Sequence, residues 1–160
     1  MERGRQPYRK GTVAMTDALF HLAFPIRDRE EAKRFYVDGL GCSLGRESET
    51  AVTFGLEGHQ LVAHVTGEQV ESQKGIYPRH FGLVFLSQTK WQALADRARE
   101  RGLRFFQQPR VRFPGNKIEH RTFFLQDPSD NLLEFKHYTN ESAILGERTF
   151  REVGDSSVLD

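Results

Sequence analysis

The chain contains two apolar segments of the same pattern, and one histidine interrupts each of them. The first segment reads FHLAF over residues 20–24, and the second reads HFGLVF over residues 80–85. In an extended chain with a period of two, the histidine points away from the face that carries the apolar side chains. His21 and His80 are 59 residues apart, and the same interval separates Asp28 from Ser87, two residues suited to cap a following helix. The sequence therefore predicts a repeated unit with an equivalent histidine in each copy.

Each copy is predicted to contain a strand, a helix and three further strands. The first unit covers about residues 18–65, with strands at 19–26, near 42–47, at about 49–56 and at 59–65, and a helix between Asp28 and Gly39. The second unit covers about residues 79–138, with strands at 79–86, 103–107, 118–126 and 132–138, and a helix between Ser87 and Gly102. Residues 108–116 are predicted to form a loop longer than its counterpart in the first unit, and long loops often cover sites.

The two units are expected to form a single domain over residues 16–138. Residues 66–78 are polar and contain glycine and proline, so they indicate a linker between the units. Residues 1–15 are basic and poor in apolar side chains, which predicts a flexible N-terminal extension. The C-terminal tail, residues 139–160, has no clear period and is expected to wrap over the domain as an irregular or short helical segment.

Charge and cysteine content restrict the function classes. A formal net charge of +1 gives no bulk electrostatic reason to expect a nucleic acid or an anionic membrane as partner, and it suits an enzyme that acts on a small molecule. The single cysteine, Cys42, cannot form an internal disulfide and excludes a zinc cluster of thiolates. No segment is apolar for the roughly 20 residues needed to span a bilayer, and the N-terminus lacks the apolar core of a secretory signal. We expect a cytoplasmic protein.

Three side chains are candidates for a metal site. On the last predicted strand, the alternation directs Glu134 away from Leu133 and Phe135, just as His21 and His80 point away from their apolar neighbours. Two neutral imidazoles and one carboxylate are the ligand set preferred by Fe(II), and Mn(II), Co(II), Ni(II) or Zn(II) would be tolerated. A single histidine in a strand is usually a structural residue, but two equivalent strands with the same placement favour a metal site.

Three motifs resemble those of a known family. They are residues 20–41 (FHLAF, followed by FY and GLG), residues 80–85, and residues 124–135, where FLQDPSDNLLEF contains Asp-Pro-Ser-x-Asn before Leu-Glu. The chain resembles the vicinal-oxygen-chelate superfamily, which includes glyoxalase I, bleomycin-resistance proteins, fosfomycin-resistance transferases and type I extradiol dioxygenases. The resemblance spans about residues 18–138. It implies an α+β fold in which two tandem βαβββ units form a curved mixed sheet around a metal cavity, with the helices outside, and it implies His21, His80 and Glu134 as metal ligands.

The chain differs from part of this superfamily at the fourth ligand position. Val62 stands where a glyoxalase I would carry a carboxylate, so a three-ligand site is favoured. That pattern is similar to extradiol dioxygenases, in which a substrate with vicinal oxygens chelates Fe(II), although strand 118–126 lacks the tyrosine that those enzymes usually carry. The alternatives are a metal-dependent thiol transferase or glyoxalase-like lyase and, less favoured, a binding protein of the bleomycin-resistance type.

Further residues are candidates for contacts with a substrate. Gln60 and His64 share the strand parity of Val62, and His64 is the candidate acid or base, with hydrogen bonding to a neighbour as the structural alternative. His120 is a weaker candidate. Lys136 shares the parity of Glu134 and could bind an anionic group, although such a lysine more often reaches solvent. The two units can close one cavity within a chain or exchange across a homodimer.

Overall fold

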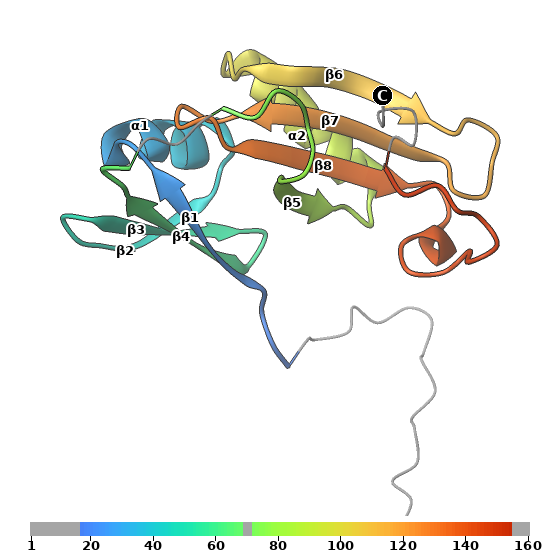
Figure 1. The fold of residues 1–160 in the computed structure, drawn as a ribbon, viewed down its shortest axis with the longest axis horizontal. Coiled ribbons are helices and arrows are strands. Elements are labelled where there is room, and N and C mark those ends of the chain that lie inside the picture. Colours follow the sequence, from blue (N-terminus) through green and yellow to red (C-terminus); the bar gives the residue numbers. More distant parts are fainter. Residues whose placement is uncertain (1–16, 69–71, 155–160) are drawn as a thin grey trace, which may run out of the picture.

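The structure is a computed structural model that describes residues 17–68 and 72–154 (Figure 1). The N-terminal extension predicted over residues 1–15 lies outside the described residues. No helix in the described part of the chain is both long and apolar enough to cross a lipid bilayer.

The first unit has the predicted order of elements. Its helix begins after Asp28, whose side chain accepts a hydrogen bond of 2.8 Å from the backbone N–H of Glu31, as the capping pattern predicts. The strands form one sheet in the order β1-β4-β3-β2, with β1 parallel to β4 and the other pairs antiparallel. The elements are β1 His21–Ile26, α1 Arg29–Lys33, the π-helical continuation η1 Arg34–Gly39, β2 Ser43–Glu47, β3 Ala51–Leu56 and β4 His59–Val65.

The second unit repeats this topology. Its sheet has the order β5-β8-β7-β6, and β5 is parallel to β8. Ser87 caps α2 by accepting a hydrogen bond from the N–H of Lys90, at the position equivalent to Asp28. The predicted tandem βαβββ fold of the α+β class is therefore confirmed. The elements are β5 Phe81–Val84, α2 Gln88–Glu100, β6 Phe105–Arg112, β7 His120–Gln126 and β8 Leu132–Tyr138, and the 3-10 helix η2 Glu141–Ala143 follows.

Strand β6 is longer than predicted. The expected loop over residues 108–116 is wrong for its first part, because pairing with β7 continues to Arg112 despite Pro109. Proline is tolerated there because β6 is an edge strand and its register shifts between Gln107 and Arg110. The connection to β7 is correspondingly shorter, and it begins at Phe113.

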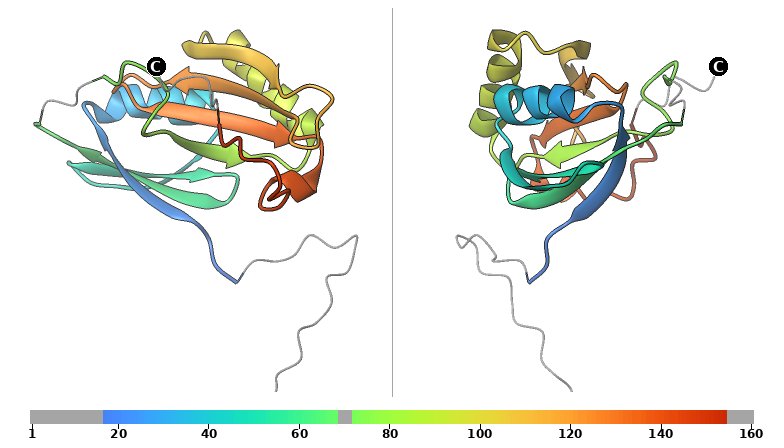
Figure 2. Two further views of the ribbon diagram at one scale, coloured as in Figure 1. Left: turned by 45° about the vertical axis from the view of Figure 1, so that its right-hand side comes forward. Right: turned by 90° about the vertical axis from the view of Figure 1, so that its left-hand side faces the viewer.

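Both units contribute to one hydrophobic core. Tyr36 stacks on Phe54 within the first unit at 4.9 Å between ring centroids, and Trp91 packs on Phe123 within the second at 5.5 Å. Across the units, the rings of Phe24 and Phe81 lie 5.1 Å apart. The two sheets remain separate layers in the described residues and form no closed barrel (Figure 2).

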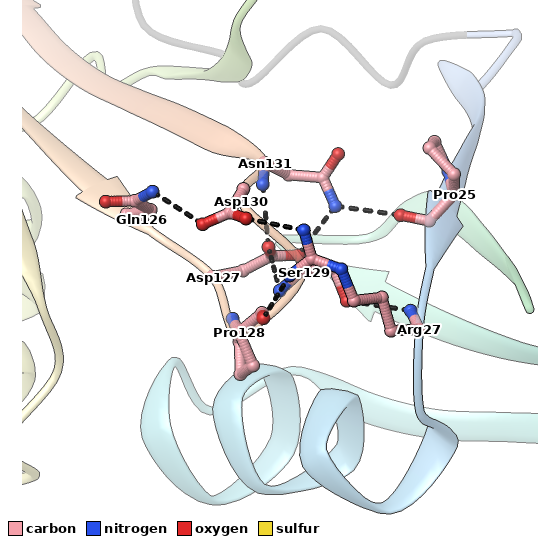
Figure 3. Close-up of polar contacts among 8 residues, drawn as sticks. All are labelled: Pro25, Arg27, Gln126, Asp127, Pro128, Ser129, Asp130 and Asn131. Atoms are coloured by element: carbon pink, nitrogen blue, oxygen red, sulfur yellow. Dashed lines mark hydrogen bonds and ion pairs between the residues drawn. The ribbon is translucent and has the colours of Figure 1, made fainter. Parts of the chain in front are cut away.

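The turn between β7 and β8 joins the second unit to the first strand of the first unit (Figure 3). Buried Asp127 organises the turn, because its Oδ1 accepts hydrogen bonds from the N–H groups of Ser129 and Asn131, both at 2.8 Å. Asn131 then donates to the carbonyl of Pro25 at 2.9 Å, and the Arg27 N–H donates to Ser129 Oγ at 2.9 Å. The Asp-Pro-Ser-x-Asn motif is thus a structural tie between the units.

Candidate metal centre

His80 and Glu134 form the centre of the candidate site. Strand β5 pairs with β8 so that Gly82 lies opposite Glu134, and this pairing brings the preceding His80 beside the carboxylate. The distance from His80 Nε2 to Glu134 Oε2 is 3.0 Å. Two of the three predicted ligands are therefore in direct contact.

Glu134 is held by three polar partners although only 5% of its side chain is exposed. The Thr122 hydroxyl donates to Oε1 at 2.7 Å, and Lys136 Nζ lies 3.3 Å from Oε2, the oxygen that also contacts His80. Burial alone would raise the pKa of Glu134, but the hydrogen bond from His80, the charge of Lys136 and the Thr122 hydrogen bond outweigh it. The pKa of Glu134 falls to about 2, so the carboxylate is ionised at neutral pH.

The orientation of His80 is fixed from the other side of its ring. Its Nδ1 lies 2.7 Å from the carbonyl of Ile76, and the ring of Phe124 meets it edge to face with 5.1 Å between centroids. The Ile76 carbonyl can only accept, so Nδ1 carries a proton and Nε2 is the nitrogen presented to Glu134. The Glu134 hydrogen bond, followed by that to Ile76, raises the pKa of His80 against the opposing effect of burial.

This donor set fits a divalent cation. A protonated Nε2 of His80 donates a hydrogen bond to the Glu134 carboxylate. If a divalent metal bound, Nε2 would lose that proton, and Nε2 and the carboxylate would both hold the metal. Metal-binding histidines commonly donate their other N–H to a carbonyl, as His80 does to Ile76.

His21, the third predicted ligand, lies apart from this pair. It is exposed on β1, where its Nδ1 donates a hydrogen bond of 2.8 Å to Gln60 Oε1. Its Nε2 takes no part in this hydrogen bond. Residues 17–68 and 72–154 contain no group of three or more His, Cys, Asp or Glu side chains close enough to hold a metal ion. One chain therefore brings together two of the three predicted ligands, and its third is on the other sheet.

The remaining candidates divide between the two sheets. Gln60 and His64 face the same side of the first sheet as His21, because the β1–β4 register pairs His21 with Gln60 and Pro25 with His64. His64 is exposed there. His120 and Lys136 belong to the second sheet and line a common cavity, and Lys136 also contacts Glu134.

Thr122 and Phe124 were not among the residues predicted for the site. Thr122 shares the strand parity of His120, and that parity is the signal that could have indicated it. Ile76 acts through its backbone carbonyl, which side-chain patterns do not reveal.

His80 lines a second cavity. It has a volume of about 390 Å³ and lies between the start of the second unit and β1. Its walls include His80, Phe81, Leu22, Pro25 and Asn131. His80 is thus open to a cavity at the junction of the two units.

Comparison with known proteins identifies the family. The profile of the Glyoxalase/Bleomycin resistance protein/Dioxygenase superfamily matches residues 18–135. The chain belongs to this superfamily, as the motifs predicted.

Solved structures support the same assignment. A glyoxalase/bleomycin resistance protein/dioxygenase from Alicyclobacillus acidocaldarius is 42% identical, with a TM-score of 0.76, and the match covers 80% of this chain and 96% of that one. The fosfomycin resistance protein FosX from Listeria monocytogenes is 17% identical, with a TM-score of 0.61 and coverage of 81% and 99%. FosX from Mesorhizobium loti is 18% identical, with a TM-score of 0.58 and coverage of 78% and 95%. These two similarities concern the fold. No curated protein matches the chain significantly.

Proposed function

We propose that the protein is a metal-dependent enzyme that acts on a small substrate with two adjacent oxygen atoms, through a centre formed by His21, His80 and Glu134. The observation that carries this proposal is the 3.0 Å contact between His80 Nε2 and the buried carboxylate of Glu134. A bound divalent metal would supply a Lewis acid and open positions for substrate oxygens. The chain itself holds the carboxylate through Thr122 and orients His80 through Ile76.

The separation of His21 from the other two ligands favours a homodimer. In this arrangement, His21 of one copy joins His80 and Glu134 of the other, and a two-fold axis makes two equivalent centres. Exposed His21 and His64 lie on the face of the first sheet opposite the core, where a second copy can approach. Gln60 would then orient His21 as Ile76 orients His80.

A mixing experiment tests the ligand set and the dimer together. His21→Ala and His80→Ala should each fail to retain stoichiometric metal. When the two variants are unfolded together and refolded, random pairing should restore about a quarter of the wild-type metal content, because one site in each mixed dimer is intact. Unchanged metal content in the single variants would refute the ligand set, and metal loss without recovery on mixing would refute the shared site.

Dioxygen-dependent ring cleavage is the first reaction to test. Two imidazoles and one carboxylate form the ligand set of Fe(II) oxygenases, and Val62 leaves no carboxylate at the fourth position. Oxygen uptake with a panel of catechols, by anaerobically purified protein reloaded with Fe(II), should be stoichiometric with substrate loss. His64→Gln tests the predicted acid or base and should lower turnover without lowering metal content.

Lys136 favours a second candidate, an oxygen-independent transferase or ring-opening enzyme. Its ammonium group beside Glu134 would attract a substrate with an anionic group. The fold similarity to FosX makes fosfomycin, a small epoxide with a phosphonate, a suitable probe. Metal-dependent consumption of fosfomycin under argon, with water or a thiol as co-substrate, would establish this reaction in place of ring cleavage.

A further inference from the structure

The segment that follows β8 encloses a cavity on the second sheet. The cavity has a volume of about 350 Å³, which lies in the range of small-molecule sites. Its floor includes His120, Lys136 and Tyr138 from β7 and β8, and residues 143–148 of the C-terminal segment form part of its wall. In Figure 1 this red segment lies at the same end of the sheet as the β6–β7 connection, which contributes Phe113.

His120 presents an unused hydrogen-bond acceptor in this cavity. Its Nδ1 lies 3.0 Å from the carbonyl of Ile118 and must donate to it, so Nε2 of the neutral ring carries a lone pair. The residue is only 4% exposed, and Nε2 has no hydrogen-bond partner among the described residues. Burial lowers the pKa of His120, and the charges of Lys136 and Arg112 lower it further, which keeps the ring neutral. A buried polar atom without a partner is costly, and a ligand that donates a hydrogen bond would satisfy it.

The second sheet places two cationic groups, Lys136 and Arg112, and one carboxylate, Glu134, around His120. Lys136 lines the cavity, and Arg112 lies opposite His120 in the β6–β7 pairing with only 5% of its surface exposed. The two acidic residues of the wall, Glu147 and Glu152, already accept hydrogen bonds, from the Ser142 hydroxyl at 2.7 Å and from the Arg151 N–H at 3.0 Å. A ligand would therefore meet a cationic group and a neutral acceptor, between apolar and aromatic walls.

We propose that this cavity is a subsite for a small organic acid that carries a hydroxyl group. The acid group pairs with Lys136, the hydroxyl donates to His120 Nε2, and the carbon skeleton packs against Tyr138 and the C-terminal segment. Because Lys136 also contacts Glu134, the subsite would place its ligand beside the candidate metal centre, and in this respect the inference rests on the proposed function. The binding itself requires no metal.

Calorimetric titration of the full chain with three matched probes tests the subsite. The probes are 3-hydroxybenzoate, benzoate and benzyl alcohol, which carry both groups, the acid alone and the hydroxyl alone. In chelator-treated protein, 3-hydroxybenzoate should bind about tenfold more tightly than benzoate, as expected for one buried hydrogen bond. Benzyl alcohol should bind most weakly.

Variants separate the contribution of each side chain. His120→Phe should abolish the tenfold preference and leave benzoate affinity within about twofold of wild type. Lys136→Met should weaken both acids by about tenfold. Ala143→Trp should fill the cavity and block all three probes, whereas Thr149→Trp, an exposed position in the same segment, should leave binding unchanged.

Nitrogen NMR of the wild-type imidazole gives an independent measurement that does not depend on a folded variant. The resonance of His120 Nε2 should move when 3-hydroxybenzoate binds and remain in place with benzoate. Equal affinity of wild type for the two acids, or an unmoved Nε2 signal, would overturn the subsite. Probe binding by a protein that takes up no added divalent metal would support the subsite and reject the proposed metal function, and metal uptake without probe binding would do the reverse.

Discussion

Among single residues, Gly82 controls how closely β5 approaches β8 at Glu134, a residue of the candidate centre. A Cβ atom at this position would lie 1.7 Å from the backbone oxygen of Glu134. Because that neighbour is backbone, it cannot rotate away, and any side chain would push β5 from β8. The absence of a side chain at Gly82 thus maintains the contact between His80 and Glu134.

Gly82→Ala should destabilise the fold by about 1–3 kcal/mol, the usual cost of overpacking, and should weaken metal binding. The control is Gly67→Ala, because a Cβ atom there would meet nothing within 4 Å. Urea denaturation and metal analysis provide the two measurements. A Gly82→Ala protein with wild-type stability and metal content would contradict the proposed constraint.

Cys42 allows a prediction of pH dependence. Burial is the main cause that raises the pKa of this thiol, from an ordinary value of 9.0 to about 12. The folded protein should therefore resist iodoacetamide at pH 8.5 and react only after denaturation. Since the unfolded thiol ionises near pH 9 and the folded thiol near pH 12, this group should lower stability as pH rises through that window and have no effect below it. In denaturation curves measured from pH 7 to 11, the free energy of unfolding of Cys42→Ala should fall less at alkaline pH than that of the wild type. Identical pH profiles for the two proteins would contradict the prediction.

The residue patterns indicated the face of a strand on which a side chain lies better than they indicated its hydrogen-bond partners. Strand alternation gives Gln60 and His64 a common parity because the period of a strand is a local property, and the β1–β4 register then puts them on the face that carries His21. The hydrogen bonds from Thr122 to Glu134 and from His80 to Ile76 depend on how separate segments approach each other. Sequence spacing contains little information on such contacts.

Among the elements, the β7–β8 turn has a role beyond reversing the chain. Tyr36 of η1 donates to Asp127 Oδ2 at 2.9 Å, and both residues are buried. Burial, followed by the charge of Asp127, raises the pKa of Tyr36 well above its ordinary range, so the hydroxyl remains a donor. The turn thereby contacts both the helix and the first strand of the other unit.

Asp127→Ala should cost about 2–4 kcal/mol, because it leaves the buried Tyr36 hydroxyl and two backbone N–H groups without their acceptor. Asp130→Asn provides a control in the same turn, because asparagine tolerates the positive φ of 65° at this position and keeps an oxygen that can accept from Gln126. Its ion pair with Arg27 spans 2.6 Å but is partly exposed, so the loss should be below about 1 kcal/mol. Urea denaturation should separate the two variants clearly, and equal losses would show that the buried acceptor is not the important feature.

Strand β6 illustrates where sequence reasoning about elements fails. Pro109 and a run of polar residues favoured a loop, whereas the edge position and shifted register allowed the strand to continue. Whether a strand lies at an edge is a property of the whole sheet. The position of the C-terminal segment was likewise unpredictable, because residues 139–154 carry no periodic pattern to indicate which surface they cover.

For the whole molecule, the arrangement of the sheets governs the candidate centre. The sequence predicted two units with equivalent histidines, but it left open whether one chain or two complete the site. His80 and Glu134 come from one sheet and His21 from the other, so relative placement of the sheets decides this question. That placement depends on contacts such as Phe24 with Phe81, which no local pattern specifies.

A site shared between two copies should depend on protein concentration. On dilution of metal-loaded protein, the fraction of dimer and the metal content per chain should fall together. Light scattering coupled to size exclusion, with metal analysis of each fraction, measures both quantities. A monomer that retains one metal per chain would contradict the shared centre, while Thr149→Trp, away from the ligands, should behave as wild type.

The common core also determines what each half of the chain can do by itself. Arg97 of α2 donates to the carbonyls of Gly39 and Asp38 at the end of η1, and the aromatic rings of both units pack within one cluster. A fragment with either half would expose a broad apolar surface and lose the partners of these polar groups. Each half should therefore depend on the other to fold, and neither is an autonomous module although the two share one topology.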